Sequence, residues 1–186
     1  MDEVYRYLEF DEADRLPAGA DTSATGVSIG VMSKSFALAG LRIGWVATRD
    51  HDLLARLAAF KDYTTICASA PAEILALIAV RAADRVLARN RAVVAANMPL
   101  LDAFFERRAG TFVWVRPRGG GIGYPRLLAD VPIERFVEDL VRETGVLLTP
   151  GAVFGDTGNH FRVGFDRTNM PQALARMEAH ATRTLR

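Results

Sequence analysis

Cysteine is almost absent from this sequence of 186 residues, in which Cys67 is the single example. One cysteine cannot form an intrachain disulfide, which excludes a disulfide-stapled scaffold and fits a reducing compartment. No histidine neighbours Cys67 in the sequence, so a buried, inert thiol is a better interpretation than a nucleophile. We therefore expect a cytoplasmic protein without a catalytic cysteine.

The sequence also lacks an excess of charge of one sign and a long apolar run. With 23 basic and 22 acidic residues the net charge is +1, so we expect no nucleic-acid or membrane partner. The longest apolar stretch, residues 68–80, is interrupted by Pro71 and Glu73 and is too short to span a membrane. No signal peptide is expected, because the first residues lack a basic segment followed by an apolar one.

Lysine is scarce as well, since the chain holds Lys34 and Lys61 against 21 arginines. This bias is compositional and proves no function, but it makes Lys34 conspicuous. Apolar residues 27–32 lead into Ser33-Lys34, and apolar residues 43–47 follow Arg42. The pattern predicts a strand, a turn with one lysine and one arginine, and a second strand.

Two interpretations of this turn stay open on spacing alone. In the first, it is a basic turn with both side chains in water. In the second, Lys34 is buried at the strand end, where desolvation favours the free amine that forms a Schiff base with an aldehyde. Arg42 would then bind an anion, because its planar fork suits two phosphate oxygens.

Four motifs in order make the second interpretation specific. Ser-Lys followed by Gly-x-Arg-x-Gly lies at residues 33–44, and Asp-x-x-Tyr lies upstream at residues 2–5. A Pro-Gly-x-x-Phe-Gly turn occupies residues 150–155, and Phe-Arg-Val-Gly-Phe occupies residues 161–165. Together they resemble the signatures of the class I/II aminotransferases, which are pyridoxal-phosphate (PLP) enzymes of fold type I.

The resemblance implies a PLP site. Lys34 would hold the cofactor as a Schiff base and carry the proton of the substrate α-carbon. Asp2 would pair with the pyridine nitrogen, which keeps the ring cationic, and Tyr5 would hydrogen-bond the 3′-oxygen. Arg42 would bind the phosphate, with Ser33 as a second contact or as a cap of the turn.

The substrate site implied by the resemblance is Arg162, which would hold an α-carboxylate with two parallel hydrogen bonds. Simpler alternatives are a disordered terminal acid for Asp2, a core tyrosine for Tyr5 and an edge-strand arginine for Arg162. The family often has a hydroxyl where this chain has Val31, so one phosphate contact is expected to be lost or supplied elsewhere. His160 is expected to be structural, and no metal site is expected.

The fold implied is α/β, with a partial three-layer PLP-transferase large domain followed by a small α+β C-terminal domain. Residues 1–83 would be the C-terminal part of the PLP-binding large domain, residues 84–109 a linking helix and residues 110–186 the small domain. The resemblance covers essentially this whole chain but about the C-terminal half of the family. We therefore expect a piece of a longer enzyme, or a chain that needs a partner carrying the other half.

Hydrophobic periodicity predicts the individual elements. The predicted strands, the first two of them buried, are 26–33, 42–48, 111–116, 122–127, 146–149 and 160–165. The predicted helices are 50–62, 71–80, 84–108, 133–141 and a last one from about 170. Residues 15–26 and 63–70 are predicted loops. Asp50 should cap its helix, Pro99 should kink or split the long one, and Gly145 should end the helix before it.

The function implied is a PLP-dependent aminotransferase that moves an amino group between an amino acid and a 2-oxo acid, as a homodimer in its full-length form. Two alternatives stay open: a PLP-dependent lyase, cyclase or oxidase with the same residues, or a truncated, non-catalytic chain that binds a partner. Residues 61–65, with Gly-Val-Met before Ser33, resemble a branch near capreomycidine synthase. Residues 63–70 lack the arginine that reads acidic substrates in some members, and the sequence does not identify the amino acid.

Overall fold

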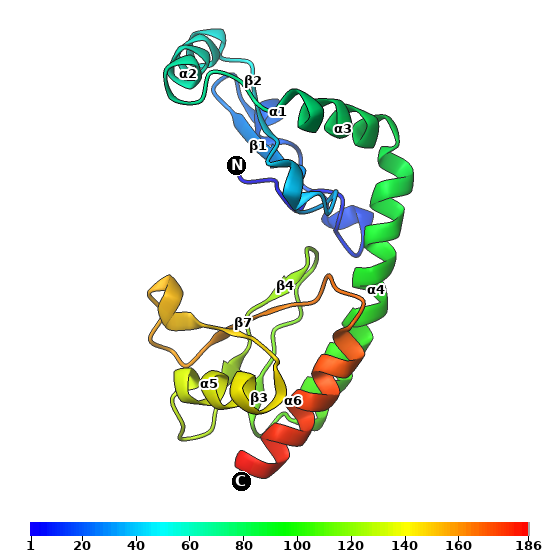
Figure 1. Ribbon diagram of the computed structural model, residues 1–186, viewed down its shortest axis with the longest axis vertical. Helices are drawn as coiled ribbons and strands as arrows, with labels where there is room; N and C mark the ends of the chain where they lie inside the picture. The colour runs from blue at the N-terminus through cyan, green and yellow to red at the C-terminus, as the bar shows by residue number, and fades with distance from the viewer. Residues whose placement is uncertain (186) are drawn as a thin grey trace. The chain divides into compact units, whose positions relative to one another are not determined.

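The computed structural model describes residues 1–185, which form two compact units (Figure 1). The first unit comprises residues 1–91 and 118–120, and the second comprises residues 92–117 and those from 121 onward. The chain passes from one to the other within helix α4 (Ala83–Arg107). The domain boundaries expected from the sequence stay a prediction, and each unit is described by itself below.

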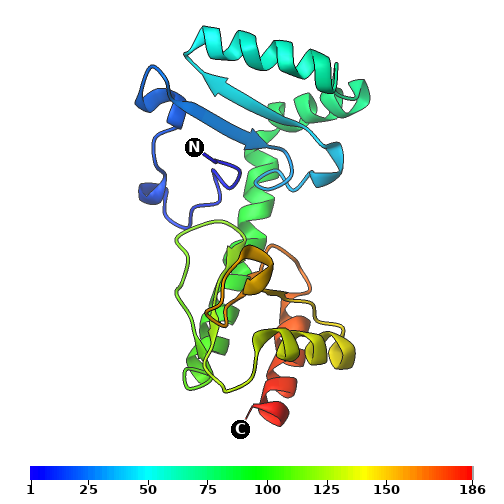
Figure 2. The ribbon, with the colours of Figure 1, turned by 90° about the vertical axis from the view of Figure 1, so that its left-hand side faces the viewer.

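The first unit is built around an antiparallel hairpin of β1 (Val27–Val31) and β2 (Gly44–Thr48), with Val31 opposite Gly44 (Figure 2). The expected strand, turn and strand are thus confirmed. Trp45 lies across Gly30, where an added Cβ would come within 2.3 Å of the indole ring, so a larger residue here would require the indole to move. The expectation that both strands are buried is wrong, because four of the five β2 residues are exposed. Within residues 1–185 no strand pairs with the other edge of β2.

Helices complete the first unit. η1 (Glu12–Asp14) comes first, α1 (Gly19–Thr22) is a short helix where a loop was expected over residues 15–26, and η2 (Ala39–Leu41) precedes β2. α2 (His51–Thr64) begins as predicted at Asp50, whose Oδ1 accepts a hydrogen bond of 2.8 Å from the Leu53 N–H.

α3 (Ala70–Arg81) turns an alanine face inward, and its Ala76 and Ala79 pack with Met32, Phe36 and Leu87. This small cluster is the core of the first unit.

Cys67 lies in the short loop between α2 and α3 and is exposed, so the prediction of a buried thiol is wrong. The absence of a neighbouring histidine argues against a nucleophile but does not determine burial, and no described segment covers this loop.

The second unit has an aromatic core between helices and short strands. Its strands are β3 (Phe112–Val113), β4 (Ile122–Gly123), β5 (Arg126–Leu127), β6 (Thr149–Pro150) and β7 (Phe161–Gly164). Its helices after α4 are α5 (Ile133–Thr144), η3 (Gly151–Phe154) and α6 (Met170–Thr184). β3 pairs with β5, and β7 lies between β4 and β6 in antiparallel register. This is the small α+β arrangement that was expected, although residues 122–127 form two short strands rather than one.

The long helix α4 continues through Pro99, so the proline does not split it, and a kink at this position stays a prediction. Met98 and Leu101, before and after the proline, are buried. α6 lies beside the C-terminal part of α4 (Figures 1 and 2), where Arg108 Nε donates to Glu178 over 2.6 Å. Gly145 ends α5 as predicted, in the left-handed conformation with φ of 74°.

Candidate active site

The lysine turn is a closed loop at the tip of the hairpin. Met32 N–H donates to Ile43 O over 3.0 Å, which continues the hairpin by one pair beyond Val31 and Gly44. Ser33 and Arg42 follow directly on the two sides of this pair, so the loop begins and ends with them. Lys34 lies on the same loop, one residue inside Ser33.

Lys34 is exposed, which corrects the expectation of a buried lysine. The segment that carries Tyr5 lies on one side of it, and Nζ is 5.6 Å from the centroid of the Tyr5 ring. Among residues 1–185 no carboxylate forms an ion pair with this amine. Lys34 is therefore free to react with a group delivered from solvent, and Tyr5 stands beside it.

Arg42 ends the loop in a left-handed conformation, with φ of 55°. Its side chain is exposed and Nη1 donates to Ala39 O over 2.9 Å. In the described part of the chain no carboxylate neutralises this guanidinium, and the half-buried Ser33 hydroxyl has no hydrogen-bond partner. A hydroxyl and an unneutralised guanidinium at the two ends of one loop are a suitable donor set for an anion such as phosphate.

Asp2 and Tyr5 belong to an irregular segment that runs beside β1. Glu3 N–H donates to Ile29 O over 2.9 Å and Ile29 N–H donates to Met1 O over 3.0 Å, so Asp2 lies in parallel register with Ile29. Asp2 Oδ1 accepts from the Val4 N–H over 3.1 Å, and its other oxygen stays available. The structure therefore brings Asp2, Tyr5 and the lysine loop into one unit.

A buried polar cluster at Glu3 was not foreseen from the sequence. Glu3 Oε1 accepts from Ser28 Oγ over 2.6 Å and from the Gly19 N–H over 2.7 Å. Burial raises the pKa of Glu3, but these two hydrogen bonds and nearby Arg6 outweigh it and hold the pKa below its ordinary value. The cluster fixes the segment that carries Asp2 to β1.

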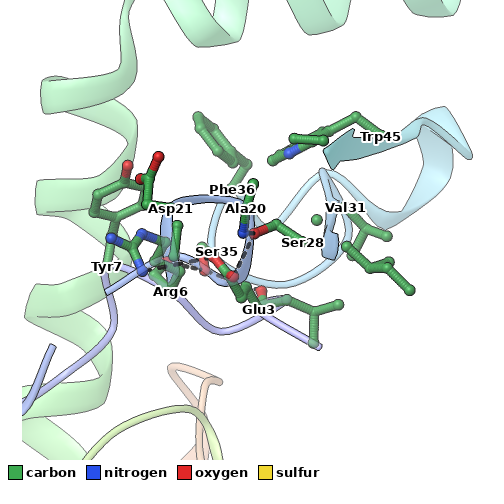
Figure 3. Close-up of a pocket in the computed structure, with 15 residues that line it drawn as sticks. Glu3, Arg6, Tyr7, Ala20, Asp21, Ser28, Val31, Ser35, Phe36 and Trp45 are labelled. Atoms are coloured by element: carbon green, nitrogen blue, oxygen red, sulfur yellow. Dashed lines mark hydrogen bonds and ion pairs between the residues drawn. The ribbon is translucent and has the colours of Figure 1, made fainter. Parts of the chain in front are cut away.

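A cavity of about 300 Å³ lies between this segment, α1 and the hairpin (Figure 3). Its lining includes Glu3, Tyr7, Ile29 and Trp45, but neither Lys34 nor Arg42. Ser35 and Phe36 of the lysine loop also line this cavity, so it lies behind the loop.

Arg162 lies in the second unit, on the exposed face of β7. Its Nη2 is 3.4 Å from Thr149 Oγ1, and its Cζ is 5.4 Å from the centroid of the Phe154 ring. Within residues 1–185 it has no carboxylate partner. The side chain can therefore offer its planar fork to a carboxylate ligand.

A hydrogen-bonded acid lies near Arg162 in sequence. Asp156 Oδ2 accepts from the Tyr124 hydroxyl over 2.9 Å and lies 2.9 Å from His160 Nδ1, while Gly158 N–H donates to Oδ1. The Gly158 bond and the Tyr124 bond lower the pKa of Asp156. These contacts hold the turn after η3 against β7, consistent with the structural role expected for His160.

Known proteins identify the family of this chain. The sequence profile "Aminotransferase class I and II" matches residues 1–177, so the chain belongs to the class I and II aminotransferase family. It is 32% identical over 151 residues to capreomycidine synthase of Streptomyces vinaceus, covering 80% of this chain and 38% of that one. It is 26% identical to the putative aminotransferase YugH of Bacillus subtilis, covering 98% of this chain and 48% of that one.

Solved structures give the same result. A PLP-dependent aminotransferase from Streptococcus suis superposes with a TM-score of 0.90 at 30% identity, covering 100% of this chain and 48% of that one. The PLP-dependent cyclase OrfR superposes with a TM-score of 0.84 at 30% identity, covering 99% and 49%. The expected family and fold are confirmed, and the chain spans about half the length of the proteins it matches.

Pyridoxal phosphate is the cofactor that the family and these structures indicate. The residues present fit it, because one unit supplies an unpaired amine, a hydroxyl, an unneutralised guanidinium and a carboxylate. Within residues 1–185 no group of side chains could hold a metal ion, and no helix is long and apolar enough to cross a membrane.

Proposed function

We propose that this chain is part of a PLP-dependent aminotransferase that moves an amino group from an amino acid to a 2-oxo acid. The observation that supports it best is the exposed amine of Lys34, which has no acidic partner and stands 5.6 Å from the Tyr5 ring on a loop that begins with Ser33 and ends with Arg42. The working enzyme would be a cytoplasmic homodimer in its full-length form. Its partners would be an amino acid and a 2-oxo acid.

PLP, when bound, supplies an aldehyde and an electron-withdrawing ring. The Lys34 amine would attach it and, when released, would take the proton from the substrate α-carbon and deliver it to the C4′ carbon of the cofactor. Asp2 would keep the ring nitrogen protonated, and Tyr5 would donate its hydroxyl proton to the 3′-oxygen. Arg42 and Ser33 would hold the phosphate.

In this proposal Arg162 orients the substrate. Its guanidinium would bind the α-carboxylate through two parallel hydrogen bonds, which sets which bond of the α-carbon faces the lysine.

The test uses the two lysines of the chain. The protein is mixed with PLP, its absorbance is recorded, and borohydride is added to fix any Schiff base before peptide mapping. We expect a band that borohydride makes permanent, with the added mass on Lys34. Lys34→Ala should lose it. Lys61→Ala is the matched control, because Lys61 is also exposed and its amine bonds only to Thr65 Oγ1 at 2.9 Å. An equal band in Lys34→Ala, or no band at all, would reject the proposal and favour a non-catalytic chain.

A PLP-dependent lyase, cyclase or oxidase is the second candidate. It is supported by the similarity to capreomycidine synthase and to the cyclase OrfR. The two candidates differ in their products, because only an aminotransferase makes a new amino acid from added 2-oxo acid. Incubation with ¹⁵N-labelled amino acids and a mixture of 2-oxo acids distinguishes them. Transfer of the label supports the aminotransferase, and conversion without transfer supports the second candidate.

A further inference from the structure

Ser35 follows the exposed Lys34 directly but is itself 4% exposed. Its Oγ lies 2.5 Å from Arg6 O and 3.0 Å from Val4 O, and its N–H points at Val4 O over 3.4 Å. Figure 3 shows Ser35 beside Arg6. The two carbonyl oxygens belong to the residues before and after Tyr5. The serine therefore grips the backbone on both sides of that tyrosine.

The gripped segment is irregular. Residues 4–7 form turns rather than a strand, and Tyr7 adopts a left-handed φ of 76°. It is tied to the unit through Glu3, through Arg6 Nη1, which donates to Leu16 O over 2.8 Å, and through Leu8 O, which accepts from Gly120 N–H over 2.9 Å. In the part of the chain that the structure describes, the backbone of residues 4–6 receives its hydrogen bonds from outside this segment through Ser35.

The backbone of Ser35 is itself fixed by a hydrogen bond. Asn90 of α4 donates from Nδ2 to the Ser35 carbonyl oxygen over 2.8 Å. The Ser35 hydroxyl is therefore attached to a backbone that is held in place. Loss of the hydroxyl would leave the Arg6 carbonyl without this donor, and Val4 O would keep only the longer bond from the Ser35 N–H.

We propose that Ser35 is a positioning residue, which sets the place of the Tyr5 ring relative to the Lys34 amine by gripping the backbone on both sides of Tyr5. The inference rests on the proposed function for its consequence, because there Tyr5 donates to the cofactor that Lys34 holds. Lys34 and Ser35 are adjacent, so one short segment exposes the amine and holds the backbone on both sides of Tyr5.

The first test needs no cofactor and uses the protein at its full natural length. Amide hydrogen exchange is measured at Arg6 and Leu8 in Ser35→Ala, Ser35→Thr and Thr48→Val. Thr48→Val is the control, because Thr48 lies in the same unit and is half-buried, but its hydroxyl accepts from the Asp50 N–H, away from the gripped segment. Losing a hydrogen bond of about 1 kcal/mol should speed exchange at residues 6–8 by about 5- to 10-fold in Ser35→Ala. Ser35→Thr should restore protection.

Unchanged exchange at Arg6 and Leu8 in Ser35→Ala, or equal acceleration in Thr48→Val, would overturn the inference. If Ser35→Ala does not fold, Ser35→Cys replaces it, because a thiol fills a similar space and donates weakly.

The second test is a double-mutant cycle on PLP affinity with Tyr5→Phe and Ser35→Ala. If the serine acts through Tyr5, the double variant should bind PLP no more weakly than Tyr5→Phe alone. Additive losses would show that Ser35 acts independently of Tyr5. If the unaltered protein binds no PLP, the proposed function fails, while the exchange measurement still decides whether Ser35 fixes Tyr5.

Discussion

The two units of this chain bury their apolar residues to very different extents. Of the largest side chains that are fully buried in residues 1–185, Met32 is the one member from the first unit. The second unit packs a cluster of aromatic rings, in which Phe112 lies 5.7 Å from Phe161 and 6.1 Å from Phe136 between ring centroids. The first unit exposes large apolar side chains on its hairpin, α2 and α3, among them Ile29, Trp45, Val46, Leu54, Leu57, Phe60, Ile74, Leu75, Leu77, Ile78 and Val80.

The difference teaches which part of the fold is self-sufficient in this chain. The second unit closes its core with its own residues, whereas the first leaves an apolar surface of the kind that marks an interaction face. This agrees with a chain that spans about half the length of the proteins it matches. The proposed PLP site sits in the unit with the open surface, so its chemistry and its stability depend on what covers that unit.

The largest expected effect is the difference in stability between alanine variants of two phenylalanines, one from each unit. Phe161→Ala removes a fully buried ring from the second unit and should lower the free energy of unfolding by about 3–5 kcal/mol. Phe60→Ala removes a ring that is 68% exposed and should change it by less than about 0.5 kcal/mol in this chain. Urea unfolding of both variants checks the contrast. A large loss in Phe60→Ala would show that α2 is covered, by a second copy or by another segment.

Two asparagines give the next contrast. Asn97 is buried and its Nδ2 donates to Phe165 O over 2.9 Å and Arg167 O over 2.7 Å. Asn97→Ala leaves both carbonyls unsatisfied and should destabilise the protein by about 1–3 kcal/mol. Asn90→Ala loses one bond at a half-buried site and should destabilise it by about 1 kcal/mol or less. Equal losses would contradict the view that the second unit has the tighter core.

The sequence predicts those features that depend on short segments. The hairpin, the Asp50 cap and the Gly145 termination follow from local chemistry, and the structure confirms each. The four motifs place the chain in its family, which the comparisons confirm. The proposed roles of Asp2, Tyr5, Ser33, Lys34, Arg42 and Arg162 stay predictions.

Features that depend on distant segments could not be foreseen. The Ser35 and Glu3 contacts join positions more than 20 residues apart, and no periodicity reports them. The exposure of β2 and of Cys67 depends on which segments are present to cover them, while an apolar pattern shows only that a residue prefers to be covered. α4 continues through Pro99, next to the buried Met98 and Leu101, and a local rule about proline does not include the packing of its neighbours.

A glycine and a tryptophan meet in both units, which allows a matched comparison. A Cβ on Gly123 would lie 2.4 Å from the Trp114 ring, and one on Gly30 would lie 2.3 Å from the Trp45 ring. Trp114 is fixed, because it stacks on Phe105 at 4.6 Å and donates to Asp102 over 2.9 Å.

Trp45 is 45% exposed and can swing away. Gly123→Ala should therefore lower the free energy of unfolding by about 1–3 kcal/mol, and Gly30→Ala should lower it by less than about 1 kcal/mol. Thermal unfolding measures both, and near-ultraviolet circular dichroism should report the moved indole in Gly30→Ala. The reverse order of stability would show that Trp45 is held by something outside the described contacts.

The smallest effect concerns one glutamate in each unit. Burial raises the pKa of Glu178, but Arg108 and Arg107 outweigh it, so the pKa lies below its ordinary value, as it does for Glu3. A carboxyl with a depressed folded-state pKa stabilises fully above the unfolded-state pKa of about 4.3, and this contribution is lost as the pH falls through the folded-state value. Glu178→Gln and Glu3→Gln should therefore be less stable than the unaltered protein at pH 7, and the gap should close in acid.

Salt distinguishes the two glutamates. Glu178 is held by arginine charges near the surface, so 1 M NaCl should reduce the stability difference between Glu178→Gln and the unaltered protein. The hydrogen bonds from Ser28 and Gly19 should preserve the corresponding difference for Glu3→Gln. Urea midpoints between pH 3 and pH 7, at low and high salt, give both readings, with the exposed Glu106→Gln as a flat control. A gap at Glu3 that collapses in salt would show that Arg6, rather than the buried hydrogen bonds, holds the first unit's acid in its charged form.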